Sequence, residues 1–326
     1  MNIQDIQKLY GVLPQGNALI KTMEEKSVRT IFLQGLLASA TPMFFASIVK
    51  RLQRTILFVL NDNDEAGYFY NDLKTIAMPD DANEQTAEVL FFPSSYRRAV
   101  KYGQRDAGNE ILRTEVLSRL SVINEEKTTS SLPLCIVTEP SALAELVVAK
   151  HKLDEHTLSI SVGQTIDLIE TEKTLRSYGF QQVDYVYEPG QFAVRGSILD
   201  VYSFSSELPY RIDFFGNDVD TIRTFEVETQ LSKDKKEKVE IVPELATLSE
   251  EKIPFLQFLP KDSVLVMKDL LYIHDTIERI YNEGFTAQAL TEQLEGKTEI
   301  EQNELRKQLQ ANIQLVTAQQ FADDAL

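Results

Sequence analysis

Residues 191–226, QFAVRGSILDVYSFSSELPYRIDFFGNDVDTIRTFE, decide the fold of the middle of this chain. The stretch predicts three consecutive β-strands, with YRIDFF (210–215) as the middle one. Because strand side chains alternate between the two faces of a sheet, one face of this strand takes only apolar and aromatic side chains, which suits a core. The other face takes Arg211, Asp213 and Phe215.

A phenylalanine beside an Arg/Asp pair on an outer face is not explained by folding alone. Arginine and aromatic side chains are enriched at protein–protein hot spots. The alternative is that Arg211 simply pairs with Asp213 or another neighbouring acid, an exposed contact worth about 0–1 kcal/mol. Phe215 favours the first interpretation, so the strand is predicted to belong to a docking surface.

Composition limits the class of protein. At 326 residues the chain exceeds a usual single core, so two or three domains are expected. It contains no apolar run of the ~20 residues that span a bilayer, and its first residues lack the basic and apolar regions of a secretory signal. The single cysteine, Cys135, lies in an apolar run and cannot form an internal disulfide. We expect a cytoplasmic chain with no membrane partner.

The net charge of −17 argues against DNA binding by this chain alone, because duplex affinity comes largely from lysines and arginines that neutralise phosphates. One local basic segment leaves an alternative open: Arg97, Arg98, Lys101 and Arg105 are interleaved with tyrosines. Such a pattern is found in single-strand binding sites, although a solvated loop followed by a helix explains it as well.

The first 154 residues predict a parallel α/β domain. Apolar strand-like runs at 30–34, 55–60, 89–93 and 134–138 alternate with helical patterns. Near-continuous apolar strands separated by helices are typical of a parallel sheet covered on both faces.

Two further domains are predicted after residue 154. Residues 155–243 predict a small inserted α+β domain, in which one helix packs on an antiparallel sheet, and the lysine-rich run 233–238 predicts a hairpin or linker at its end. Residues 244–326 predict a helix-rich domain, with helices over 265–287 and 291–314.

A loop beginning at Gly35, GLLASATP, stands where a nucleotide-binding P-loop would stand, after a strand and before a helix. Ser39 also lies in this loop, in which Ala40 replaces the second glycine and Thr41 replaces the phosphate-binding lysine. Pro42 replaces the Mg²⁺-binding hydroxyl residue and removes a backbone N–H. The sequence therefore predicts a degenerate P-loop that binds no nucleotide.

No other pattern predicts a catalytic or metal site. The acidic run 61–64 follows a strand, as Mg²⁺-binding carboxylates do, but it suits the cap of the next helix better. The three histidines and the cysteine have no metal-ligand spacing, and no nucleophile elbow or paired-carboxylate motif is present. We expect no enzyme activity in this chain.

Three motifs carry a family resemblance. Arg195-Gly196 with Asp200, the run LPYRIDFF ending at Phe215, and a final segment running from Asp220 to Ser232 resemble the second domain of the UvrB-like module at the N-terminus of bacterial transcription-repair coupling factors. The match is specific over 185–232 and colinear, though weaker, from about residue 10 to the end.

The resemblance implies that this module mimics UvrB and recruits UvrA to lesions that stall RNA polymerase. Its UvrA contacts fall on Arg195, Arg211 and Phe215; Arg223, on the next strand, is a further candidate that the family does not supply. The resemblance also implies a RecA-like (helicase-like) first domain with a non-functional P-loop, and a docking face that another domain masks in the resting protein.

For the rest of the protein, the resemblance implies a chain that continues past Leu326. ATP hydrolysis, its Mg²⁺, double-stranded DNA binding and RNA polymerase binding would belong to later translocase domains, so no cofactor is expected here, and the fragment is expected to be monomeric. Two rival interpretations stay open: an ATP-dependent enzyme like UvrB or a helicase, and a DNA-contacting module.

Overall fold

The computed structural model describes residues 2–25, 27–79, 81–95, 107–125, 132–245, 251–283, 298 and 315–325. The chain divides into two compact units: unit 1 (1–104, 123–146 and 254–326) and unit 2 (105–122 and 147–253). The predicted boundaries after residues 154 and 243 stay predictions. Within the described ranges, none of the helices has both the length and the apolar character needed to cross a membrane.

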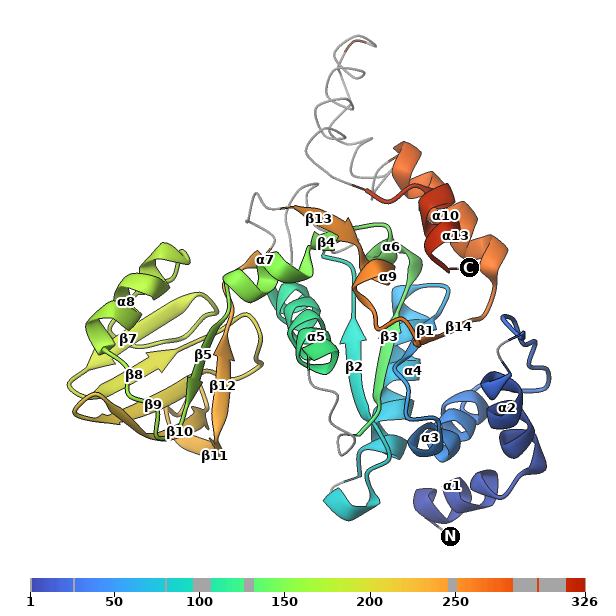
Figure 1. The fold of residues 1–326 in the computed structure, drawn as a ribbon, viewed down its shortest axis with the longest axis horizontal. Coiled ribbons are helices and arrows are strands. Elements are labelled where there is room, and N and C mark those ends of the chain that lie inside the picture. The colour runs from blue at the N-terminus through green and yellow to red at the C-terminus, as the bar shows by residue number, and fades with distance from the viewer. Residues whose placement is uncertain are drawn as a thin grey trace. The chain divides into compact units, whose positions relative to one another are not determined.

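Unit 1 is built on a four-stranded parallel sheet (Figure 1). Its strand order is β14 (Val264–Met267), β1 (Ile56–Val59), β3 (Leu134–Thr138), β2 (Glu88–Phe92). All residues of β1 and β3 are buried, which explains their unbroken apolar sequence. The predicted parallel α/β sheet is confirmed, and three of the four predicted strands lie in it.

Helices pack on this sheet through a mainly aliphatic core that contains a chain of aromatic contacts. Phe45 of α3 (Ala40–Leu52) meets Phe58 of β1 edge to face, and Phe58 in turn contacts Phe69 of α4 (Asn63–Ala77). The remaining elements described in unit 1 are α1 (Ile3–Gly11), α2 (Pro14–Glu24), the 3₁₀ helix η1 (Ala82–Glu84), α6 (Pro140–Leu143), α9 (Phe255–Phe258), α10 (Leu270–Glu283) and α13 (Ala318–Ala325). Cys135 is buried in β3, and burial raises its pKa to about 12, as expected of an inert core thiol.

Two predictions for unit 1 are wrong. Residues 30–34 form no strand: β1 already has β14 and β3 as its neighbours, and Phe32 is 87% exposed. The helix predicted over 265–287 is shorter, because its first residues form strand β14 and α10 begins only at Leu270. The other predicted helix, 291–314, lies outside the described residues.

Unit 2 contains a six-stranded sheet with one helix on its core face. The strand order is β11 (Ser232–Lys236), β10 (Asp218–Phe225), β9 (Tyr210–Phe215), β8 (Ile198–Val201), β7 (Gln191–Arg195), β6 (Gln181–Gln182), antiparallel except for the β6–β7 pair. α8 (Leu168–Ser177) and a second sheet of β5 (Leu158–Ser161) and β12 (Lys238–Ile241) contribute to the same core. The structure also has α5 (Ala107–Glu125), α7 (Lys150–Glu155) and a pair formed by β4 (Leu146–Val148) and β13 (Lys252–Pro254).

Two further corrections concern unit 2. The stretch 191–226 forms four strands rather than three, because the chain reverses at Gly196, whose φ of +64° lies in the left-handed region that favours glycine. Of the two structures predicted for the run 233–238, the linker is wrong: its residues form most of β11, the second strand of the β10–β11 hairpin, and the start of β12. The predicted alternation in β9 is confirmed, since Tyr210, Ile212 and Phe214 are buried in the core.

Gly67 and Gly196 differ in backbone conformation and therefore give a matched stability test. Gly67 lies inside α4 with open space at its Cβ position, so Gly67→Ala is expected to raise the free energy of unfolding by about 0.5–1 kcal/mol. Gly196 has equal space but a positive φ, so Gly196→Ala is expected to lower it by about 1–2 kcal/mol. Urea denaturation followed by circular dichroism measures both; effects of the same sign would contradict this account.

Candidate functional site

The face of the six-stranded sheet opposite α8 carries the predicted site residues. Strand register places Ala193, Asp200, Arg211, Arg223 and Lys235 in one row across five strands. We call this side the outer face and define it by its charged and aromatic residues: Arg195, Asp200, Arg211, Asp213, Phe215, Arg223 and Lys235. These seven residues include four cations and two carboxylates, in a chain whose net charge is −17.

Asp200 is the centre of the outer face. Its side chain is fully buried, and both of its oxygens accept hydrogen bonds from Arg211: Nε donates to Oδ1 and Nη2 to Oδ2, each at 2.8 Å. The third nitrogen, Nη1, donates to the carbonyl of Gln230 at 3.1 Å. The guanidinium also lies 4.4 Å from the ring centre of Phe225. The pairing with Asp200 raises the pKa of Arg211 above its ordinary value.

Arg195 shares the same carboxylate. Its Nη2 donates to Oδ2 of Asp200 and its Nη1 to the carbonyl of Asp184, at 3.0 Å for the latter. Its guanidinium lies 4.9 Å from the ring centre of Tyr185. Arg195 also borders a depression of about 840 Å³, whose walls are Gln182, Val183, Asp184, Tyr185, Val194 and Arg195 itself. One buried carboxylate therefore fixes both arginines for which the sequence predicted a partner contact.

Phe215 is placed quite differently. It ends β9 just before the turn at Gly216, whose φ is +65°, and 83% of its surface is exposed. It lies four residues beyond Arg211, roughly 13 Å along the strand. Thus a large apolar side chain projects from the end of a rigid hairpin, next to a charged surface. Such an arrangement matches the composition of protein interfaces.

Arg223 lies between the fixed arginine and the edge strand. Its Nη2 pairs with Asp213, which also accepts a hydrogen bond of 2.9 Å from the hydroxyl of Thr221. The structure thus bears out the alternative in which Arg211 pairs with a neighbouring acid, although that acid is the buried Asp200, and Asp213 pairs with Arg223. A partner contact by Arg211 stays a prediction.

Sequence reasoning assigned no role to two residues of this face. The position of Asp200, a carboxylate within an apolar strand, could be noticed in the sequence. Its two arginine partners could not be predicted from that position. Gln230 lies in the motif segment 220–232, but its contacts could not be read from that motif: it adopts a positive φ of 58°, and its side-chain amide donates to the carbonyls of Val186 and Val227. This fixes the loop whose backbone carbonyl holds Arg211.

The predicted degenerate P-loop is a tight turn before α3. Gly35 has a φ of +94° and Ala38 a φ of +46°. The amide of Ala40 donates to the carbonyl of Leu37 at 3.0 Å, and that of Thr41 to Ala38 at 3.3 Å. Pro42, in the first turn of the helix, has no N–H to offer. Of the amides that would cradle a phosphate, those of Ala40 and Thr41 are therefore bonded within the loop, and position 42 has none.

The Ser39 hydroxyl donates to Asp72 of α4 at 2.7 Å, so it too has a partner inside the unit. The acidic run after β1 acts as predicted: Asp62 caps α4 and accepts a hydrogen bond from the amide of Glu65 at 2.9 Å. The basic segment with Arg97, Arg98, Lys101 and Arg105 lies outside the described residues. The structure therefore does not test the DNA-contacting alternative, which stays open.

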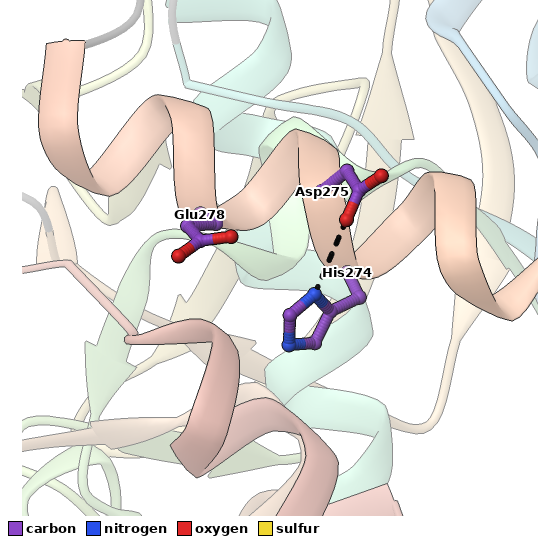
Figure 2. A group of neighbouring side chains, drawn as sticks. All are labelled: His274, Asp275 and Glu278. Carbon is purple, nitrogen blue, oxygen red and sulfur yellow. Dashed lines mark hydrogen bonds and ion pairs between the residues drawn. The ribbon is translucent and has the colours of Figure 1, made fainter.

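One group of potential metal ligands lies on α10. Figure 2 shows His274, Asp275 and Glu278, whose ligand atoms all lie within 4.8 Å of one another. The two carboxylates are exposed, and His274 Nδ1 lies 3.5 Å from Asp275. All three come from one helix surface, where charged side chains commonly gather without an ion, so we assign no metal to them. The expectation of no metal site stays a prediction.

Comparison with known proteins matches the same part of the chain to a known family. Residues 158–246, which contain the whole outer face, match the family model of the UvrB interaction domain. The predicted resemblance is confirmed. Transcription-repair-coupling factors are similar to this chain: that of Escherichia coli (strain K12) is 33% identical over 128 residues (39% of this chain, 11% of the relative), and that of Bacillus subtilis (strain 168) is 26% identical over 248 residues (73% and 19%).

The relative from Haemophilus influenzae is 28% identical over 156 residues, or 48% of this chain and 13% of the relative. The matched part of the chain therefore spans between 11% and 19% of the length of these three curated relatives.

The shared carboxylate predicts a large stability effect. Asp200→Asn leaves two arginines facing a neutral amide in a buried position, so the free energy of unfolding is expected to fall by about 3 kcal/mol. Asp213→Asn, which breaks a partly exposed pair on the same face, is the matched control and should cost about 1 kcal/mol. Equal losses in urea denaturation would show that Asp200 is not the anchor of this face.

Proposed function

We propose that this chain is the N-terminal UvrB-like module of a transcription-repair coupling factor, acting in transcription-coupled nucleotide excision repair. Its second unit imitates UvrB and docks UvrA through the outer face, which brings UvrA to the stalled-polymerase lesion. Translocation on double-stranded DNA, ATP hydrolysis and RNA polymerase binding then belong to other parts of the full-length protein.

Phe215 is the observation that carries this proposal. It is an exposed aromatic on a strand otherwise well packed, within the segment that matches the UvrB interaction domain. In the folded chain this side chain gains little from burial, whereas docking into an apolar pocket of a partner buries it. Supporting it are the nearby arginines, whose positions are fixed before any partner arrives, so little side-chain entropy is lost on binding.

Replacing Phe215 tests the proposal directly. Phe215→Ala is expected to weaken UvrA binding by about 2 kcal/mol or more, roughly 30-fold, because a hot-spot aromatic loses its pocket. Tyr68→Ala is the matched control, since Tyr68 is 78% exposed but lies on α4 of unit 1. Titration calorimetry with purified UvrA measures both. An unchanged affinity for Phe215→Ala, with the fold intact by circular dichroism, would overturn the proposal.

We further propose that unit 1 is a RecA-like fold with a degenerate P-loop that binds no nucleotide. The bonded amides of Ala40 and Thr41 and the proline at position 42 support this. Titration of a fluorescent ATP analogue with Mg²⁺ is expected to show no saturable binding up to millimolar concentration. Saturable, Mg²⁺-dependent binding that unlabelled ATP displaces would favour the ATP-dependent rival instead.

A further inference from the structure

The cations of the outer face differ in whether their donors are free. All three side-chain nitrogens of Arg211 are bonded inside the unit, and two of those of Arg195 are. Only 14% of the Arg211 side chain is exposed. An approaching partner therefore finds the two predicted contact arginines largely occupied.

Arg223 and Lys235 have donors to spare. The Arg223 side chain is 33% exposed and pairs with Asp213 through Nη2, and within the described residues its Nη1 makes no hydrogen bond. Lys235 is exposed, and within the residues that the structure describes it has neither a hydrogen bond nor an ion pair from its ammonium group. These two side chains are adjacent on neighbouring strands.

The register also sets like charges against one another. Arg211 faces Arg223 across the β9–β10 pair, and Arg223 faces Lys235 across the β10–β11 pair. Like charges directly opposite one another destabilise a sheet, so a row of three cations is not what folding alone favours. Asp200 offsets Arg211 and Asp213 offsets Arg223, which leaves Lys235 as the uncompensated end of the row.

We infer that Arg223 and Lys235 bind carboxylates on an acidic protein surface of UvrA, beside the pocket that receives Phe215. This inference rests on the proposed docking of UvrA and names the chemistry of that contact. Arg211 and Arg195 then act as positioning residues that keep the row in place. A protein surface fits better than nucleic acid, because Asp213 lies beside Arg223 and Asp218 lies opposite Phe215, and both would repel a continuous run of phosphates.

The test replaces Lys235 by a neutral residue. Because the Lys235 ammonium group has no partner within the described residues, its removal leaves no other charged group unpaired. Lys235→Gln is expected to slow association with UvrA about tenfold at low salt and to flatten the salt dependence of the rate, because such a charge steers encounter. Lys236→Gln is the matched control: Lys236 is the next residue of the same strand, equally exposed, but it pairs in register with Ile222 of the core face. Surface plasmon resonance at several salt concentrations gives both rates.

The outcomes separate this inference from the proposed function. If Lys235→Gln matches Lys236→Gln while Phe215→Ala abolishes binding, the acidic contact is wrong and UvrA docking stands. If the unchanged chain does not bind UvrA, both the acidic contact and the proposed UvrA docking are wrong. A short DNA duplex serves as the second probe: binding to it that depends on Lys235 would overturn the assignment of a protein partner.

Discussion

The outer face of unit 2 depends on one buried carboxylate. Asp200 has no solvent to stabilise its charge, so its two arginine partners must do so. A buried ion cluster of this kind adds little net stability, since desolvation offsets most of its attraction. Its effect is geometric: because both oxygens are engaged, Arg195 on β7 and Arg211 on β9 are held in fixed positions on either side of β8, where Asp200 lies.

From this anchor the face divides into fixed and free groups. Gln230 closes the Arg211 side through its backbone carbonyl, and Phe225 lies under the guanidinium. On β10 and β11, Arg223 and Lys235 keep unused donors, and Phe215 projects from the hairpin end of β9. A rigid support that carries a few exposed groups loses less conformational entropy on binding than a flexible surface does. Removing Arg211 would thus act mainly by disturbing its neighbours.

Local pattern predicted the elements of this chain well, and pairing between distant residues poorly. The two-residue alternation in β9 sorted its faces correctly, and the buried runs at β1, β2 and β3 gave the parallel sheet. Residues 30–34 have the same strand-like sequence but no free position beside β1, a fact that only the arrangement of strands determines. The turn at Gly196 divides one predicted strand into two. Glycine adopts positive and negative φ almost equally well, so the sequence did not show whether Gly196 lies in a turn or within a strand.

The candidate site shows the same limit. Phe215 and Arg211 could be chosen from a single strand, but the role of Arg211 depends on Asp200, eleven residues earlier, and on Gln230, nineteen residues later. At such sequence separations, the sequence alone does not show which acidic residue pairs with which basic residue. The row of Arg211, Arg223 and Lys235 emerges only from the strand register, which turn lengths and a bulge in β10 set.

Photo-crosslinking from position 215 tests the central claim most directly. With a benzophenone amino acid in place of Phe215, irradiation of the chain mixed with UvrA should give a covalent complex, whereas the same amino acid at Tyr68 should give none. Crosslinks from position 68 without any from position 215 would contradict the account, because UvrA would then dock on unit 1 and not on the outer face.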